Sequence, residues 1–241
     1  MVSRARRSRH AARKERAGFR LGIVGIVIAA ILGIGCLGTL GVCFVWLQDL
    51  PDYTDASAYN VAEKTKVYAS DGTTLLAELY LENRDPIELS EMGDYVTQGT
   101  VATEDERFYE HNGVDLWGIL RAVWVNGHEG ASTITQQFVR NTILSDEMQE
   151  STLKRKVREA YIAIQLEQMY SKEEILQMYL NTINYGQGAY GIQAAAELYF
   201  SKNAKDLTIA EAATLIGIPQ APTYNNPIDN PDNCLESQFG S

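Results

Sequence analysis

The sequence predicts a mainly α-helical domain with a short β element, preceded by one transmembrane helix. Three observations lead to this prediction. Residues 21–47 form an uncharged apolar run, residues 66–89 hold two β-rich segments around a turn, and apolar residues recur at helical spacing after Met92. Hydrophobic residues make up 45% of the 241 residues, which is enough for a packed core.

The apolar run of residues 21–47 predicts an uncleaved anchor in the cytoplasmic membrane. It contains 27 residues without a charge, whereas the hydrocarbon core of a bilayer requires about 20 in a helix. A cleaved signal peptide is the alternative, but its apolar region usually has only about 7 to 15 residues, and no clear small-x-small cleavage site stands immediately before the acidic segment at Asp49.

The charge distribution sets the expected topology. Residues 1–20 carry a net charge of +7 and the remainder carries −17, within a total of −10. Basic residues beside an anchor stay on the cytoplasmic side, so we expect a single-pass protein with its N-terminus inside and its catalytic domain outside the cytoplasm. The acidic body argues against a nucleic-acid partner.

The outer part divides into a linker at residues 48–91 and a helical domain at residues 92–241. Asp71-Gly72 lies between two β-rich runs and predicts a short hairpin within the linker. Further on, helices are expected over residues 115–126, 151–170, 172–180 and 209–218. Their starts are marked by Asp115 as an N-cap and by the capping-box pairs Ser171/Glu174 and Thr208/Glu211.

The predicted helix that begins at Asp115 has an amphipathic pattern with two interpretations. Trp117, Leu120 and Trp124 share one face. Because tryptophan prefers the interface between bilayer and water, this face could touch the membrane, but an ordinary core helix would show the same spacing.

Four polar stretches are candidates for chemistry. Residues 104–106 are consecutive acids, which suit either a solvated face or a proton-transferring carboxylate. Residues 129–141 suit hydrogen bonding to sugar or phosphate oxygens, or else a polar loop and helix start. Residues 154–159 suit a diphosphate clamp or a surface ion-pair ladder, and residues 172–192 combine an apolar stripe with a glycine-rich turn. The second stretch also contains Thr135, and its candidate substrate-binding residues are Ser132, Thr133, Gln136, Gln137, Arg140 and Asn141.

Together, these stretches resemble the signature motifs of the peptidoglycan glycosyltransferases, the transglycosylase module of class A penicillin-binding proteins and of monofunctional transglycosylases. The matching words are E-D-x-x-F-x-x-H-x-G at 104–113, G-x-S-T-I-T-Q-Q at 130–137, R-K-x-x-E at 155–159 and K-x-x-I-L-x-x-Y-L-N at 172–181. Residues 212–227 resemble the start of the family's fifth region.

The resemblance implies a lysozyme-like, mainly α fold with a small membrane-proximal lobe. It also implies polymerisation of lipid II, a lipid-linked disaccharide-pentapeptide, with inversion at the anomeric carbon during cell wall synthesis. The expected partners are lipid II, the lipid-linked glycan chain and the cytoplasmic membrane, with other cell-wall synthesis proteins as further candidates.

The resemblance also implies roles for individual residues. Glu104 matches the catalytic glutamate and is assigned as general base, because an alcohol needs a base when it attacks. Glu159 matches the second catalytic glutamate, acting either through Mg²⁺ or another divalent cation or by orienting Arg155 and Lys156. No organic cofactor is expected. Asp105, Lys172 and Asn181 complete the substrate-binding set, and Asp105 and His111 are expected to hold the first motif in shape.

Other functions stay open at this point. A lytic, lysozyme-like hydrolase would share a helical fold and a key glutamate, and a membrane-anchored scaffold would need no catalysis. Serine acyl transfer is suggested by S-x-x-K at Ser151, but no K-T-G follows. After Pro227 the chain lacks the family's arginine-pair segment, so we expect a truncated or altered fifth motif, as in a fragment of a bifunctional protein.

Overall fold

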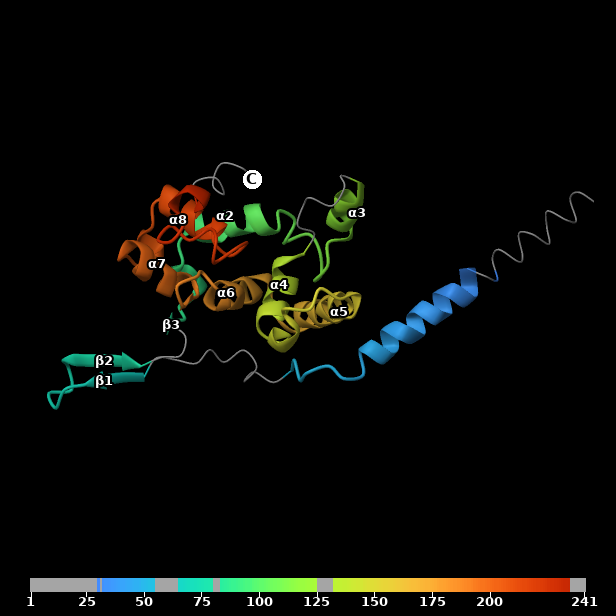
Figure 1. Cartoon of the computed structure of the whole chain (residues 1–241), viewed down its shortest axis with the longest axis horizontal. Helices are drawn as coiled ribbons and strands as arrows, with labels where there is room; N and C mark the ends of the chain where they lie inside the picture. The colour runs from blue at the N-terminus through green and yellow to red at the C-terminus, as the bar shows by residue number, and fades with distance from the viewer. Residues whose placement is uncertain (1–29, 31, 55–64, 80–82, 125–131, 235–241) are drawn as a thin grey trace, which may run out of the picture. The chain divides into compact units, whose positions relative to one another are not determined.

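A computed structural model describes residues 30, 32–54, 65–79, 83–124 and 132–234 (Figure 1). The chain forms two compact units, Met1–Asp49 and Leu50–Ser241. The predicted basic tail at residues 1–20 lies outside the described residues. The first part of the predicted anchor, residues 55–64 and 80–82 of the linker, and Gly130 of the second motif also lie outside the described residues.

The first unit contains a helix over residues 32–46. Its large apolar side chains are mostly exposed, and Ile34, for example, keeps 72% of its accessible surface. Within the described part of the chain, no helix reaches the combined length and hydrophobicity that crossing a membrane requires.

The second unit is mainly helical. Its longer helices are α2 (Asp94–Glu104), α3 (Leu116–Trp124), α4 (Ile134–Asn141), α5 (Leu153–Met169), α6 (Lys172–Thr182), α7 (Ile192–Phe200) and α8 (Ile209–Gly217). Short 3-10 helices are η2 (Leu89–Glu91), η3 (Ser145–Glu147) and η4 (Ala204–Asp206). The strands are β1 (Thr65–Tyr68), β2 (Leu75–Leu79), β3 (Asn83–Arg84) and β4 (Ala189–Tyr190).

The strands form two small sheets. β1 and β2 pair antiparallel, with Thr65 opposite Leu79, and the turn at Asp71-Gly72 lies between them. This confirms the predicted hairpin. β3 and β4 form a parallel pair that was not predicted, because two-residue strands from distant parts of the chain carry no local periodicity.

The predicted helix starts are confirmed. Thr208 and Glu211 form a capping box at the start of α8, and Ser171 and Glu174 do the same for α6. Asp115 Oδ1 accepts the backbone N–H of Trp117 at the start of α3. The helix predicted for residues 151–170 begins two residues later, because Thr152 is its N-cap.

Helix α4 lies in the core. It contacts both α5 and α6, while α2 packs along α8 (Figure 1). Six of its residues are buried, from Ile134 to Val139, so the polar stretch predicted as a loop or helix start is largely interior. The apolar stripe predicted in α6 is also buried, since Ile175, Leu176, Tyr179 and Leu180 are at most 1% exposed.

The face of α3 that carries two tryptophans is exposed. Trp117, Leu120 and Trp124 keep 68%, 60% and 89% of their accessible surface. Among the described residues nothing covers this face, so the interpretation of α3 as an ordinary core helix is wrong.

Gly113 brings the first motif against the backbone of α5. Its φ of +86° lies in the left-handed region, and a Cβ there would stand 2.7 Å from backbone atoms of Ala163 and Ile164. Any side chain would therefore push the loop that follows α2 away from α5.

We predict that Gly113→Ala lowers the free energy of unfolding by about 1 to 3 kcal/mol more than Gly188→Ala does, because only the first substitution creates a backbone clash. Gly188 is a matched control, since its φ is +74° and nothing lies within 4 Å of its added Cβ. Denaturant unfolding of both variants measures the difference, and equal losses would refute the close-approach explanation.

Candidate active site

Glu104 is the last residue of α2 and is half-buried. Its Oε2 accepts a hydrogen bond of 2.8 Å from Nε2 of Gln137 on α4. Oε1 is buried and takes up no hydrogen bond from the described residues. A buried carboxylate oxygen without a hydrogen-bond donor costs free energy, which makes Glu104 a candidate for a functional role.

The amide of Gln137 joins Glu104 to a buried tyrosine. The hydroxyl of Tyr179 on α6 donates to Gln137 Oε1 over 3.1 Å. Burial raises the pKa of Tyr179 well above its usual range, and the charge of Glu104 adds to the rise. The pKa of Tyr185 is raised for the same two reasons, which places both phenols within the electrostatic field of Glu104.

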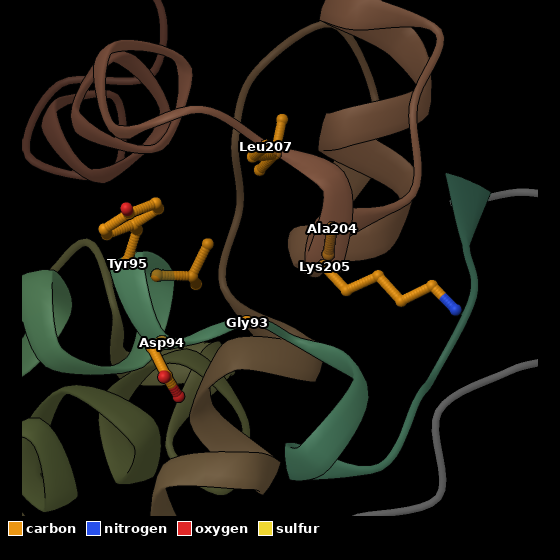
Figure 2. Close-up of a pocket in the computed structure, with 7 residues that line it drawn as sticks. Gly93, Asp94, Tyr95, Ala204, Lys205 and Leu207 are labelled. Carbon is orange, nitrogen blue, oxygen red and sulfur yellow. The ribbon is translucent and has the colours of Figure 1, made fainter.

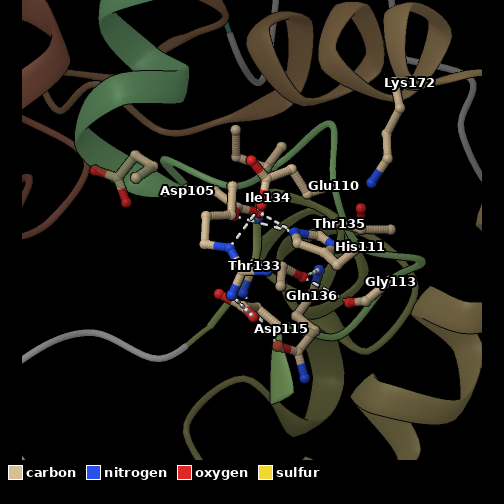
Figure 3. A network of polar contacts seen from close by, with 12 residues as sticks. Asp105, Glu110, His111, Gly113, Asp115, Thr133, Ile134, Thr135, Gln136 and Lys172 are labelled. Carbon is tan, nitrogen blue, oxygen red and sulfur yellow. Dashed lines mark hydrogen bonds and ion pairs between the residues drawn. The ribbon is translucent and has the colours of Figure 1, made fainter. Parts of the chain in front are cut away.

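Asp105 fixes the chain immediately after Glu104 (Figure 3). Its Oδ2 accepts the backbone N–H of Ile134, the first residue of α4, over 3.0 Å. Both carboxylate oxygens lie 3.0 Å from Nε2 of His111, and because a carboxylate only accepts, this nitrogen donates. These hydrogen bonds support the predicted role of Asp105 and His111 in holding the first motif in shape.

Two predicted binding residues form the N-terminal cap of α4. Thr133 Oγ1 accepts the backbone N–H of Gln136 and donates to the carbonyl of Gly113 over 2.7 Å. The Gln136 side chain in turn accepts the backbone N–H of Thr133, which completes a capping box. Both side chains are thus engaged with the protein backbone (Figure 3).

The third motif forms a cluster of charge on α5. Glu159 is fully buried and lies 2.9 Å from Lys156 Nζ and 3.3 Å from Arg155 Nε. Lys156 also donates to Ser132 Oγ over 2.9 Å, which joins the cluster to the residues before α4. The Lys156 side chain is 41% exposed whereas Arg155 is nearly buried, so Lys156 is the cation that a ligand can reach.

The described residues contain no group of three or more His, Cys, Asp or Glu side chains placed to hold a metal ion. Both oxygens of Glu159 face cations of the protein, which are the same positions that a metal ion would need.

Lys172 and Asn181 contact neither the Glu104–Gln137 pair nor the charged residues around Glu159. Lys172 Nζ lies 2.7 Å from Glu167 and 4.3 Å from the ring centre of Phe108. Glu167, on α5, also accepts from Thr135 Oγ1 of α4 over 2.5 Å, so this carboxylate joins the start of α6 to both α5 and α4. Asn181 holds the backbone of Ile87 with both ends of its amide. These contacts support structural roles for both residues.

The remaining predicted residues differ in exposure. Arg140 and Asn141 end α4 with partly exposed side chains, and the charge of Arg140 is felt at Tyr179. Glu106 is exposed, as the solvated-face interpretation of that position predicts.

A shallow cavity of about 290 Å³ lies at the start of α2, away from these groups. Residues of α2 and η4 line it, and Figure 2 shows that the side chains of Asp94 and Lys205 point in different directions. No residue of the predicted site lines it, and the charged side chains of Asp94 and Lys205 do not converge on it.

Sequence reasoning missed the role of Tyr179. The residue was predicted as part of the core stripe of α6, and its burial agrees with that. A buried tyrosine hydroxyl usually requires a partner, which was the available signal, but the sequence alone could not identify Gln137 as that partner.

Comparison with known proteins places the chain in a family. Residues 71–239 match the family described as Transglycosylase. Penicillin-binding protein 1A of Rickettsia felis is 38% identical over 212 residues, covering 85% of this chain and 26% of that protein. Penicillin-binding protein 2D of Bacillus subtilis is 42% identical over 226 residues, covering 91% and 32%.

A crystal structure of penicillin-binding protein 1A from Haemophilus influenzae is also similar, with 23% identity and a TM-score of 0.41, over 74% of this chain and 17% of that one. The chain spans about a quarter to a third of the length of the curated relatives described above. Because the family match covers more than half of the chain and includes all four motifs, the chain belongs to the transglycosylase family, the peptidoglycan glycosyltransferase module of class A penicillin-binding proteins.

Proposed function

We propose that this chain polymerises lipid II into glycan strands, with inversion, at the outer face of the cytoplasmic membrane. The observation that carries the proposal is the half-buried carboxylate of Glu104, with one oxygen held by Gln137 and the other without a partner among the described residues. The cation cluster on α5 supports a substrate that carries phosphate.

In the proposed reaction, Glu104 acts as general base. Its free oxygen accepts the proton of the 4-hydroxyl of the incoming lipid II as that oxygen attacks the anomeric carbon of the growing glycan. The bond from this carbon to the lipid diphosphate breaks, and the diphosphate leaves with the electron pair. Attack from the side opposite the leaving group inverts the anomeric centre.

The leaving diphosphate needs neutralisation, which we assign to Lys156 as the accessible cation, with the nearly buried Arg155 adding its positive charge from behind. Glu159 holds these two cations through its two oxygens. We therefore favour the orienting role of Glu159 over a role as a ligand for Mg²⁺ or another divalent cation. Ser132, bonded to Lys156, lies where it can contact the same phosphate groups.

Membrane attachment is proposed on two grounds. Residues 21–47 carry no charge, and the exposed tryptophan face of α3 is suited to the interface of a bilayer. A lysozyme-like arrangement with a small membrane-proximal lobe is the fold that the motifs imply. It would place α3 near the lipid that carries the substrate.

A lytic hydrolase is less well supported. It would share a carboxylate such as Glu104, but it binds no lipid diphosphate and so has no need for the buried pairing of Glu159 with two cations.

The first prediction from the proposed function tests Glu104 as the general base. Glu104→Gln keeps the size of the side chain and removes its ability to accept a proton, so polymerisation should fall by roughly 100-fold or more. The measurement is gel analysis of polymer formed from labelled lipid II by the purified chain. Glu106→Gln, the same change at an exposed neighbour, should retain activity. Near-normal polymerisation by Glu104→Gln would exclude it as the base.

The second prediction concerns Glu159. Glu159→Gln removes the negative charge that holds Lys156 and Arg155, so affinity for the lipid-linked donor should fall roughly tenfold, the scale of one charge-assisted hydrogen bond. The loss should be the same throughout a Mg²⁺ series if the role is orientation. Glu110→Gln, which breaks an exposed ion pair, is the control. A loss confined to low Mg²⁺ would instead support a metal site.

The third prediction concerns α3. The tryptophan fluorescence of residues 50–241 should shift to shorter wavelength with anionic vesicles, because Trp117 and Trp124 would enter the interface. The double variant Trp117→Ser/Trp124→Ser should lose vesicle binding measured by flotation. Unchanged fluorescence of the parent protein with vesicles would contradict membrane contact by this face.

A further inference from the structure

Tyr179 and Gln137 form a directional chain of hydrogen bonds that ends on Glu104. The Tyr179 hydroxyl donates to Gln137 Oε1, and Gln137 Nε2 donates to Glu104 Oε2. Each of the three side chains comes from a different helix, α6, α4 and α2 respectively. Tyr179 is only 1% exposed and Gln137 only 9%, so water has little access to replace either bond.

The direction of the chain follows from the chemistry of its two ends. An ionised carboxylate accepts only, so the group that faces Glu104 must be the N–H of the amide and not its oxygen. The amide of glutamine is two-sided, and a half-turn about its last bond would bring Oε1 against the carboxylate. The Tyr179 donor makes that half-turn costly, because Oε1 would lose its hydrogen bond in a buried place.

We propose that Tyr179 is a positioning residue for Glu104, acting through the orientation of the Gln137 amide. Its hydroxyl holds Oε1 of Gln137 so that Nε2–H always faces Glu104, which favours the carboxylate over the carboxylic acid. The inference rests on the proposed role of Glu104 as general base, and it gives an interior tyrosine of α6 a function that packing alone does not require.

Other groups around Glu104 do not duplicate this role. Tyr185, which follows α6, lies within its electrostatic field, and Arg140 on α4 acts on Tyr179 through its charge. Neither makes one of the hydrogen bonds that set the orientation of the Gln137 amide.

Tyr179→Phe removes the hydroxyl and keeps the ring that fills the core. Without its donor, the Gln137 amide either turns its oxygen to Glu104 or donates a weaker, unpolarised bond. Both outcomes disfavour the carboxylate, so the acidic limb of the pH–rate profile for polymerisation should move to higher pH by about 0.5 to 1 unit. Turnover should fall at low pH, KM should change little, and the rate above the midpoint should approach that of the parent.

Two comparisons separate positioning from general destabilisation. Tyr199→Phe removes another tyrosine hydrogen bond, to the carbonyl of Tyr185, and should leave the midpoint in place. Gln137→Met should raise the midpoint at least as much as Tyr179→Phe, and adding Tyr179→Phe to it should cause no further shift. Any of three outcomes would overturn the proposal. The midpoint could stay unshifted in Tyr179→Phe, it could shift equally in Tyr199→Phe, or Tyr179→Phe could still shift it when added to Gln137→Met.

A second readout does not need activity. In the full chain with ¹³C-labelled glutamate carboxyls, the signal lost in Glu104→Gln identifies Glu104, and its titration midpoint should rise in both Tyr179→Phe and Gln137→Met. If lipid II is not polymerised but this midpoint shifts, the positioning chain stands and the proposed function fails. If polymer forms but neither midpoint moves, the proposed function stands and the positioning role is wrong. If Tyr179→Phe does not fold, Gln137→Met gives the decisive result. An unchanged titration midpoint of Glu104 in Gln137→Met would show that the Gln137 amide does not act on Glu104, and the proposal would fail.

Discussion

The buried carboxylate of Asp105 is the constraint on which the site depends. It receives the first N–H of α4 and the imidazole of His111, so the end of α2 and the start of α4 are held together. Because Glu104 is the preceding residue and Gln137 lies one helical turn into α4, this clamp brings the two side chains within hydrogen-bond distance. The carboxylate also suits the positive end of the α4 dipole.

The burial of α4 gives the polar second motif its significance. Thr133 and Gln136 cap the helix, and each of the side chains of Thr133, Gln136 and Gln137 makes a hydrogen bond within the protein. An unpaired polar group in this interior would cost about 1 to 3 kcal/mol, so the motif tolerates little chemical variation even where it does not touch substrate. The same reasoning applies to Glu159, whose burial is compensated by two cations.

The two halves of the proposed chemistry are electrostatically distinct. Glu104 accepts a hydrogen bond from the neutral amide of Gln137, and the phenols of Tyr179 and Tyr185, whose pKa values burial and the charge of Glu104 raise, carry no charge at physiological pH. The cations of the third motif are instead paired through Glu159 and reach Ser132 before α4. A carboxylate beside neutral groups and a separate group of cations suit the proposed roles of base and phosphate site.

Sequence by itself determined the helical character, the hairpin, the capped helix starts and the four motifs, because capping and periodicity are local properties read over a few residues. Only the tertiary structure decided how the motif residues are used. It placed Thr133 and Gln136 in a cap, Lys172 in an ion pair with Glu167, and Tyr179 behind Gln137. It also exposed the tryptophan face of α3, for which spacing allowed two interpretations. These outcomes depend on which helices pack together, and that choice depends on contacts between residues far apart in the chain.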